Sequence, residues 1–128
     1  MNILFVMIGG FLGSISRYSI GEWIHSGNGF PFATLTINLI GCFILGWFLT
    51  YAVHARKVTH KMTLLIGTGF IGSFTTFSTF SVETLTLFQI GLVGQATLYV
   101  FTSIIVGILL TFLGHKLALS RKSEAVEE

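Results

Sequence analysis

Long apolar stretches dominate the chain, and most of the charged residues lie between or after them. The four stretches lie near residues 2–24, 31–54, 62–89 and 94–119. A run of about 20 apolar residues is long enough to cross a bilayer as a helix. The runs are also too long and too continuous for the alternating strands of a membrane β-barrel. The pattern therefore predicts an all-α membrane protein with four transmembrane helices.

The composition agrees with a membrane environment. Of the 128 residues, 52% are hydrophobic and only 9% are charged, and the mean hydropathy is +0.85. So few charges cannot cover a soluble globule of this size. We expect a single transmembrane domain, residues 1–119, followed by a short, charged and disordered tail, residues 120–128.

The first stretch has the features of a retained helix rather than a cleaved signal. It has no basic segment before its apolar part, continues past Arg17 and has no small-residue cleavage site. Gly9 and Gly13 stand in a GxxxG relation, which allows close approach of another helix. Arg17 follows four residues later on the same face, deeper than an ordinary loop charge, and snorkelling to the headgroups is the alternative explanation for it.

The third stretch is longer than one straight crossing needs and becomes polar from Gly72 to Glu83. Gly67 and Gly69 come shortly before this part, which is rich in Ser, Thr and Phe. Glycine and β-branched Thr lower helix propensity, and Ser and Thr hydroxyls can satisfy backbone groups where a membrane helix opens. We predict a break in this helix. At such breaks freed carbonyls can coordinate a cation, and exposed N–H groups can face an anion.

The second and fourth stretches each carry a polar or small-residue face. In the second, Thr34 and Asn38 are four residues apart, and Gly41 follows about one turn later. In the fourth, residues at steps of four form the face, namely Tyr99, Ser103, Gly107, Thr111 and His115. Both faces bring hydrogen-bonding groups into the membrane.

The basic residues are distributed unevenly over the connections. The connections near residues 26–31 and 89–94 contain no Lys or Arg, whereas the one from His54 to Lys61 contains three. The positive-inside rule then places both termini in the cytoplasm. The net charge is +2, but the basic residues flank membrane segments and form no patch with exposed aromatics. We therefore expect no nucleic-acid partner.

The chemically active residue types form no known catalytic arrangement. The chain has no aspartate and no GxSxG, HExxH or phosphate-loop motif, so we expect no enzymatic activity. Cys42 is the only cysteine, which excludes an internal disulfide. The four histidines lie near the predicted helix ends, as expected for polar residues at the water boundary rather than for a metal site.

The polar residues within the predicted helices favour an anion over a cation. They are mainly hydrogen-bond donors without a membrane-centred carboxylate, whereas cation pathways usually carry Asp or Glu. Phe77 and Phe80 agree with this interpretation, because the edge of an aromatic ring is positive. Two Phe residues three apart are also typical of core packing, so this pair alone does not decide between the two.

Three segments carry motifs that together cover most of the chain. They are Gly9-Gly10 with Gly13 and Arg17-Tyr18, the run TLTINLIG over residues 34–41, and the run GFIGSFTTFSTFSVE over residues 69–83. In combination with the four predicted helices, they resemble the Fluc (CrcB) family of fluoride channels.

The resemblance implies a fluoride-selective channel that lets cytoplasmic fluoride leave a bacterial cell passively through its inner membrane. The family pattern is an antiparallel dimer with two narrow pores. It also has a central structural sodium ion, here on the backbone carbonyls of Gly72 and Thr75. Arg17 would lie at a vestibule and Glu83 near a pore end. The implied pore residues are Phe77, Phe80, Asn38, Thr34, Ser78, Tyr99, Ser103 and Glu83.

The charge bias raises a question about the partner in such a dimer. An antiparallel dimer of one gene product needs a chain that inserts both ways. We therefore expect this chain to pair either with itself, despite its bias, or with an oppositely oriented homologue. A small multidrug exporter coupled to protons is the alternative function, but it needs a glutamate in the middle of the first helix, and Glu22 lies near the end. A purely structural membrane protein would leave the polar third stretch unexplained.

Overall fold

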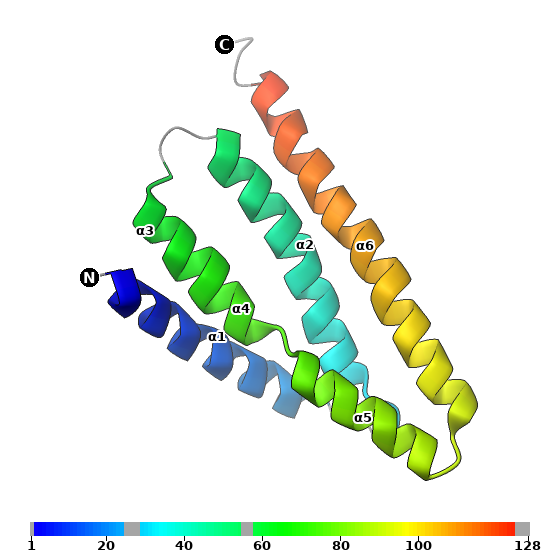
Figure 1. The fold of residues 1–128 in the computed structure, drawn as a ribbon. Coiled ribbons are helices and arrows are strands. Elements are labelled where there is room, and N and C mark those ends of the chain that lie inside the picture. The colour runs from blue at the N-terminus through cyan, green and yellow to red at the C-terminus, as the bar shows by residue number, and fades with distance from the viewer. Residues whose placement is uncertain (1, 25–28, 55–57, 125–128) are drawn as a thin grey trace.

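The chain folds into long helices, each packed along a neighbour (Figure 1). The computed structural model describes residues 2–24, 29–54 and 58–124, with side chains described as far as residue 120. Within these residues the helical segments are α1 (Asn2–Trp23), α2 (Phe32–His54), α3 (His60–Met62), the π-helix η1 (Thr63–Ile71), α4 (Gly72–Phe74), α5 (Phe77–Gln89) and α6 (Val93–Glu124).

Among the described residues, four stretches are long and apolar enough to cross a membrane, which confirms the predicted class of multi-pass helical membrane protein. Their bounds, 2–23, 32–54, 60–89 and 93–120, agree with the predicted ones to within two residues. α6 continues through the start of the predicted tail to Glu124. Residues 125–128 lie outside the described residues.

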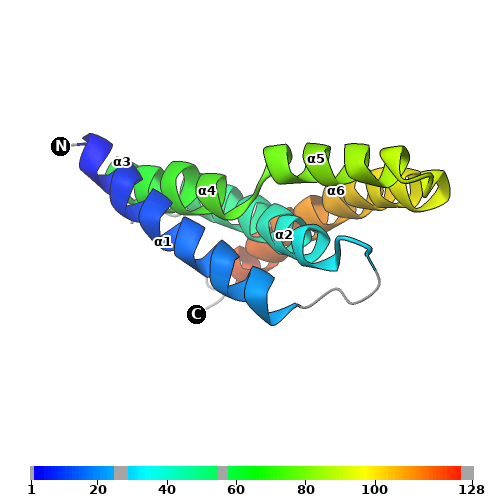
Figure 2. The same cartoon turned by 90° about the horizontal axis from the view of Figure 1, so that it is seen from below.

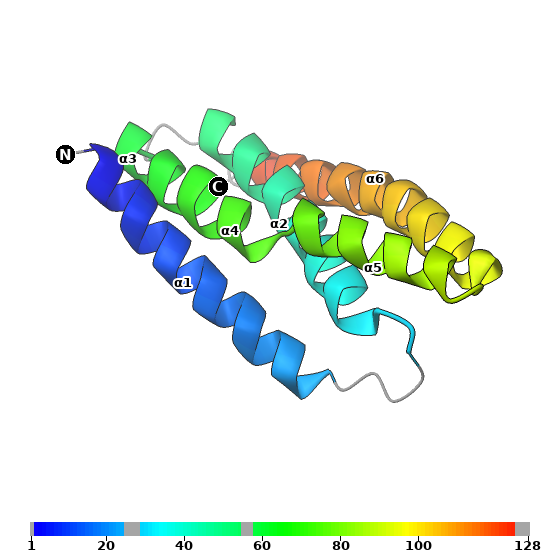
Figure 3. The same cartoon turned by 60° about the horizontal axis from the view of Figure 1, so that its bottom comes forward.

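α2 lies between the α3–α4 part of the third segment and α6. Figure 1 shows the helices side by side in the order α1, the α3–α4 segment, α2 and α6. Figures 2 and 3 show that α5 lies against α6 and well away from α1. Within the described residues α1 packs on η1 and α4 and contacts neither α5 nor α6. The N-terminus, α3 and the last turns of α2 and α6 lie toward the same end of the molecule (Figure 1).

Close helix packing depends on glycines at two crossings. A Cβ atom on Gly9 would meet the carbonyl oxygen of Leu65, and one on Gly13 would meet that of Phe70, so α1 approaches η1 at backbone distance. This confirms the predicted role of the GxxxG pair. At the second crossing, a Cβ atom on Gly46 of α2 would meet the carbonyl oxygen of Thr111 in α6.

The turn between α5 and α6 reverses the chain in three residues. Gly91 has φ +84°, its N–H bonds to the carbonyl oxygen of Phe88 at 3.1 Å, and the N–H of Leu92 bonds to that of Leu87 at 2.9 Å. This is the Schellman arrangement, which needs a residue tolerant of positive φ. It folds α6 back along α5 and brings Tyr99 opposite Glu83.

The third segment is interrupted at Thr75 and Thr76. α4 ends at Phe74, both threonines are extended with ψ angles of 154° and 125°, and α5 begins at Phe77. Gly67 and Gly69, which precede the interruption, remain helical inside η1. A Cβ atom on Gly69 would lie 2.7 Å from the carbonyl oxygen of Val6, so this glycine serves packing against α1 rather than opening the helix.

Candidate functional site

A single side chain from α2 holds the interruption in place. The Asn38 amide donates from Nδ2 to the carbonyl oxygen of Thr76 at 2.9 Å, and its Oδ1 accepts from the N–H of Thr76 at 2.8 Å. The amide thus satisfies both backbone groups of a residue that neither helix includes, as membrane burial requires. The Thr76 hydroxyl caps α5 by accepting from the N–H of Thr79 at 3.2 Å.

The hydrogen bonds that the N–H groups of Thr76 and Thr79 make here leave two backbone carbonyls without their helical donors. In a continuous helix the N–H of Thr76 would bond to the oxygen of Gly72, and the N–H of Thr79 to the oxygen of Thr75. Here the first donor goes to Asn38 and the second to the Thr76 hydroxyl. Gly72 and Thr75 therefore lose their helical donors at the same place.

A groove of about 340 Å³ opens beside the interruption. Asn38 lines it, together with Phe77 and Phe80, whose ring centroids are 5.9 Å apart at an interplanar angle of 35°. Phe77 is 80% exposed on the single chain. The remaining lining residues are Gly41, Cys42, Leu45, Thr75, Thr76, Ser103 and Ile104.

Glu83 lies half-buried between α2 and α6 and accepts two hydroxyl hydrogen bonds. Thr34 donates to Oε1 and Tyr99 donates to Oε2, each at 2.8 Å. The Tyr99 side chain is fully buried, so the carboxylate satisfies a phenol that water does not reach. Each hydroxyl has one hydrogen, and in this arrangement the carboxylate receives both.

An aromatic cluster joins the two parts of the site. The ring of Phe80 lies 5.0 Å from that of Tyr99, and Phe30 meets the other side of Tyr99 in an edge-on contact at 5.7 Å. Phe80 thereby links the groove beside Asn38 to the carboxylate cluster. A further cavity of about 290 Å³, lined by Phe30, Glu83 and neighbouring residues, lies beyond Glu83.

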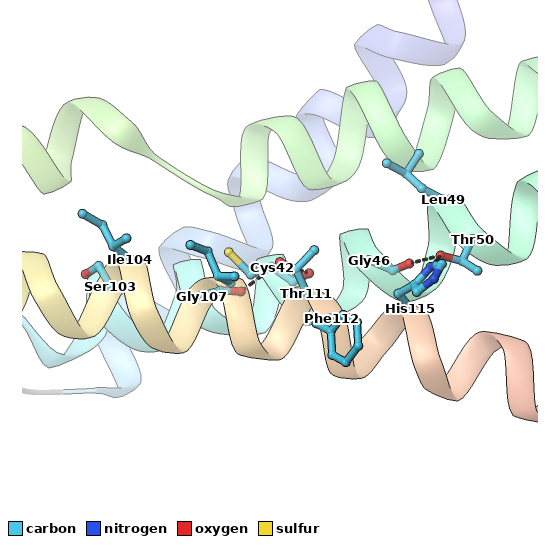
Figure 4. A pocket seen from close by; sticks show the side chains of 11 residues that line it. Cys42, Gly46, Leu49, Thr50, Ser103, Ile104, Gly107, Thr111, Phe112 and His115 are labelled. Carbon is cyan, nitrogen blue, oxygen red and sulfur yellow. Dashed lines mark hydrogen bonds between the residues drawn. The ribbon is translucent and has the colours of Figure 1, made fainter.

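A cavity of about 680 Å³ continues along the seam between α2 and α6 (Figure 4). It shares Cys42, Ser103 and Ile104 with the groove beside Asn38 and extends to Thr50 and His115. The polar faces predicted for the second and fourth stretches thus meet along one continuous seam.

The structure brings together most of the predicted site residues. One groove is lined by Phe77, Phe80, Asn38 and Ser103. The cluster next to it consists of Thr34, Tyr99 and Glu83. Ser78 lies on the first turn of α5, with its Oγ 3.3 Å from the Thr76 hydroxyl.

Arg17 is the predicted site residue that stands apart. It is half-buried on α1, outside the three cavities described here. Two further residues of the site, Thr76 and Phe30, were not predicted from the sequence. A signal for Thr76 was present, because a threonine three residues before another polar residue at a helix start is typical of an N-cap.

Comparison with known proteins agrees with this geometry. The family model described as "CrcB-like protein, Camphor Resistance (CrcB)" matches residues 4–115. The chain belongs to the CrcB-like family. A CrcB-like relative from Oceanobacillus iheyensis, named "Fluoride-specific ion channel FluC", is 55% identical over 123 residues, covering 96% of this chain and 95% of the relative.

More distant CrcB-like relatives carry the same name. Those from Acidobacterium capsulatum and Thermus thermophilus are 45% and 44% identical, each over 116 residues. These matches cover 89% of this chain and 93% and 91% of the respective relatives. The family model over residues 4–115 includes α2, the interruption and most of α6.

Proposed function

We propose that this chain is a fluoride-selective ion channel that lets fluoride leave the bacterial cytoplasm passively and so prevents its toxicity. The observation that carries the proposal is the near-full-length similarity to proteins named fluoride-specific ion channels. The Asn38 groove supplies the matching chemistry. A bilayer potential of 100 mV, inside negative, drives one anion outward by about 2.3 kcal/mol without ATP.

The groove beside Asn38 suits a small, strongly hydrated anion. The amide has two N–H groups. One of them bonds to Thr76, and the residue lines the groove, so the second N–H is available to replace a water of hydration. The edges of Phe77 and Phe80 add positive potential without adding a charge that would hold the ion too tightly.

The neighbouring polar residues extend this path on either side. Ser103 lines both grooves of the α2–α6 seam. Thr34 and Tyr99 offer hydroxyl hydrogens that fluoride would take over from the Glu83 carboxylate as it passes. Ser78 would contribute a hydroxyl at the start of α5. Arg17 would act at a vestibule, where its charge attracts anions toward the pore.

The interruption also fits a structural sodium ion. Sodium sites in membrane proteins use carbonyl oxygens from unwound helix ends, and the carbonyls of Gly72 and Thr75 have both lost their helical donors. Within the described residues no group of three or more His, Cys, Asp or Glu residues could hold a metal. The cation would therefore rest on backbone oxygens, and its charge would partly offset the cost of dehydrating a nearby anion.

A second chain is needed to complete the pathway. Both grooves are open to the outside of the single chain, and Phe77 is 80% exposed next to one of them. An antiparallel partner, either a second copy or an oppositely oriented homologue, would cover these grooves and enclose two pores. The exporter alternative finds no support in the structure, because Glu22 lies in the last turn of α1.

Fluoride efflux from liposomes containing the purified protein tests the function. We expect rapid fluoride release and little chloride release under the same gradient. Phe80→Ile should suppress fluoride release while the protein still assembles, because it removes the aromatic edge and keeps an apolar side chain. Phe101→Ile, at an exposed position on α6, is the matched control and should release fluoride normally. Equal rates for the two anions, or no release, would exclude a selective channel.

A further inference from the structure

The far end of the α2–α6 seam carries a cluster that the proposed pore does not include. Two histidines, His54 in the last turn of α2 and His115 on α6, meet the same residue, Thr50. Nδ1 of His54 lies 2.8 Å from the Thr50 carbonyl oxygen, and Nδ1 of His115 lies 2.7 Å from the Thr50 hydroxyl. Figure 4 shows the His115 ring turned toward Thr50 at the end of the cavity.

The hydrogen bonds determine which ring nitrogen carries the hydrogen. A carbonyl oxygen can only accept, so Nδ1 of His54 must be the donor. The Thr50 hydroxyl donates its one hydrogen to the carbonyl oxygen of Gly46 at 2.7 Å. It must therefore accept from Nδ1 of His115. In both rings the nitrogen that gains a proton is Nε2, and protonation at Nε2 leaves the contacts to Thr50 intact.

The position of His115 connects this chemistry to the anion path. His115 lines the cavity of about 680 Å³ that also reaches Ser103, and Ser103 lines the groove beside Asn38. A neutral Nε2 presents a lone pair, which repels an anion. A protonated Nε2 presents a cationic N–H group, which is a strong donor to fluoride.

Few other charges face this ring within the described residues. Among the side chains that the structure describes on α2 and α6, the titratable groups near His115 are the Cys42 thiol inside the cavity, the exposed Tyr51 next to Thr50, His54 one turn beyond Thr50, and the exposed Lys116 that follows His115 in the sequence; Tyr99 lies in the Glu83 cluster. No carboxylate lines the cavity, so a proton on His115 adds positive charge that no lining acid neutralises.

We propose that His115, held by Thr50, forms a proton-dependent anion-binding site that receives fluoride at the end of the α2–α6 seam. The inference rests on the proposed channel function for its role in transport, but the binding site itself does not require it. His115 is the last of the polar residues at steps of four along α6, and imidazole is the type of side chain that most readily gains a proton near neutral pH.

Fluoride release at pH 6 and pH 8, with equal pH on both sides and a clamped membrane potential, tests the role in transport. A unit positive charge 4 Å from a fluoride ion in water attracts it by about 1 kcal/mol. This energy corresponds to about fivefold tighter binding of the anion. We expect wild-type release about fivefold faster at pH 6. His115→Gln, whose amide can still donate to Thr50, should release fluoride at the same rate at both values. Vesicles with Phe80→Ile, measured at each pH, provide the background from hydrogen fluoride crossing the lipid.

His60→Gln is the matched control, because His60 is an exposed histidine on α3 outside the seam. It should keep the wild-type pH dependence, and the inference fails if His115→Gln keeps it as well. In detergent, added fluoride should shift the Nε2 NMR signal of His115 at pH 6 and not at pH 8, whereas gluconate should shift neither. Absence of that shift overturns the site. If the wild type releases no fluoride at all, the proposed function fails, and the NMR measurement still decides whether the site exists.

Discussion

Replacing Asn38 most directly distinguishes its two roles, which are to line the groove and to hold the interruption at Thr76 in place. In Asn38→Asp one oxygen still accepts from the N–H of Thr76, but the other oxygen faces the Thr76 carbonyl, to which the amide donates at 2.9 Å. Losing that bond and leaving the partner unsatisfied costs about 1–3 kcal/mol of folding free energy. The variant should therefore still fold and assemble, with a lowered unfolding temperature.

The effect of Asn38→Asp on transport should be much larger than its effect on stability. An anion 4 Å from the new carboxylate is repelled by about 4 kcal/mol at an effective dielectric constant of about 20. Each 1.4 kcal/mol is a factor of about ten, so fluoride release should fall by about a thousandfold. Ion-selective electrode recordings of liposomes at pH 8, which favours the charged carboxylate, measure this directly.

The control for that experiment is Asn38→Ala, which removes both bonds to Thr76 without adding charge. It should lower stability more than Asn38→Asp does, and should reduce fluoride release less. Release by a folded Asn38→Asp protein within tenfold of the wild type would refute the placement of fluoride next to this amide.

Two further predictions concern the packing of the helices. Gly46→Ala should lower the free energy of unfolding by about 1–3 kcal/mol, because the added Cβ would meet the Thr111 carbonyl oxygen. Gly10→Ala, with no atom within 4 Å of the new Cβ, should be neutral in the same thermal unfolding assay; equal losses in both would contradict the close α2–α6 approach. Thr76→Ala should cost about 1 kcal/mol by removing the N-cap of α5. Thr97→Ala, an exposed threonine that bonds within its own helix, should change stability less.

The membrane-spanning part of the fold follows from local sequence patterns. The length of an apolar run is set by the thickness of the bilayer, so the four spans could be predicted to within two residues. The GxxxG pair at Gly9 and Gly13 is also local, and the structure uses it for a close crossing with η1.

The position of the interruption could not be read from local propensity in the same way. Gly67 and Gly69 are poor helix formers in water, yet both stay helical inside the π-helix, and the small size of Gly69 lets that helix pack closely against α1. The interruption falls at Thr75 and Thr76, inside the polar stretch Gly72–Glu83. Its bonds come from Asn38, 38 residues away from Thr76.

The same limit applies to the polar clusters. Glu83 bonds to Thr34, 49 residues away, and Thr50 meets His115, 65 residues away. Periodicity shows which residues share a face of one helix. It does not show which faces of different helices meet, and the family resemblance supplied part of that information only for the pore residues.

The contact between Asn38 and Thr76 also bears on how the protein is assembled during synthesis. α2 is made before the third segment, so its amide is already in the membrane when Thr76 enters. Both backbone groups of Thr76 can then find partners as the segment inserts, instead of being exposed to lipid until a later stage. A chain in which the order of these two segments was exchanged by circular permutation would lose this template and should insert less efficiently.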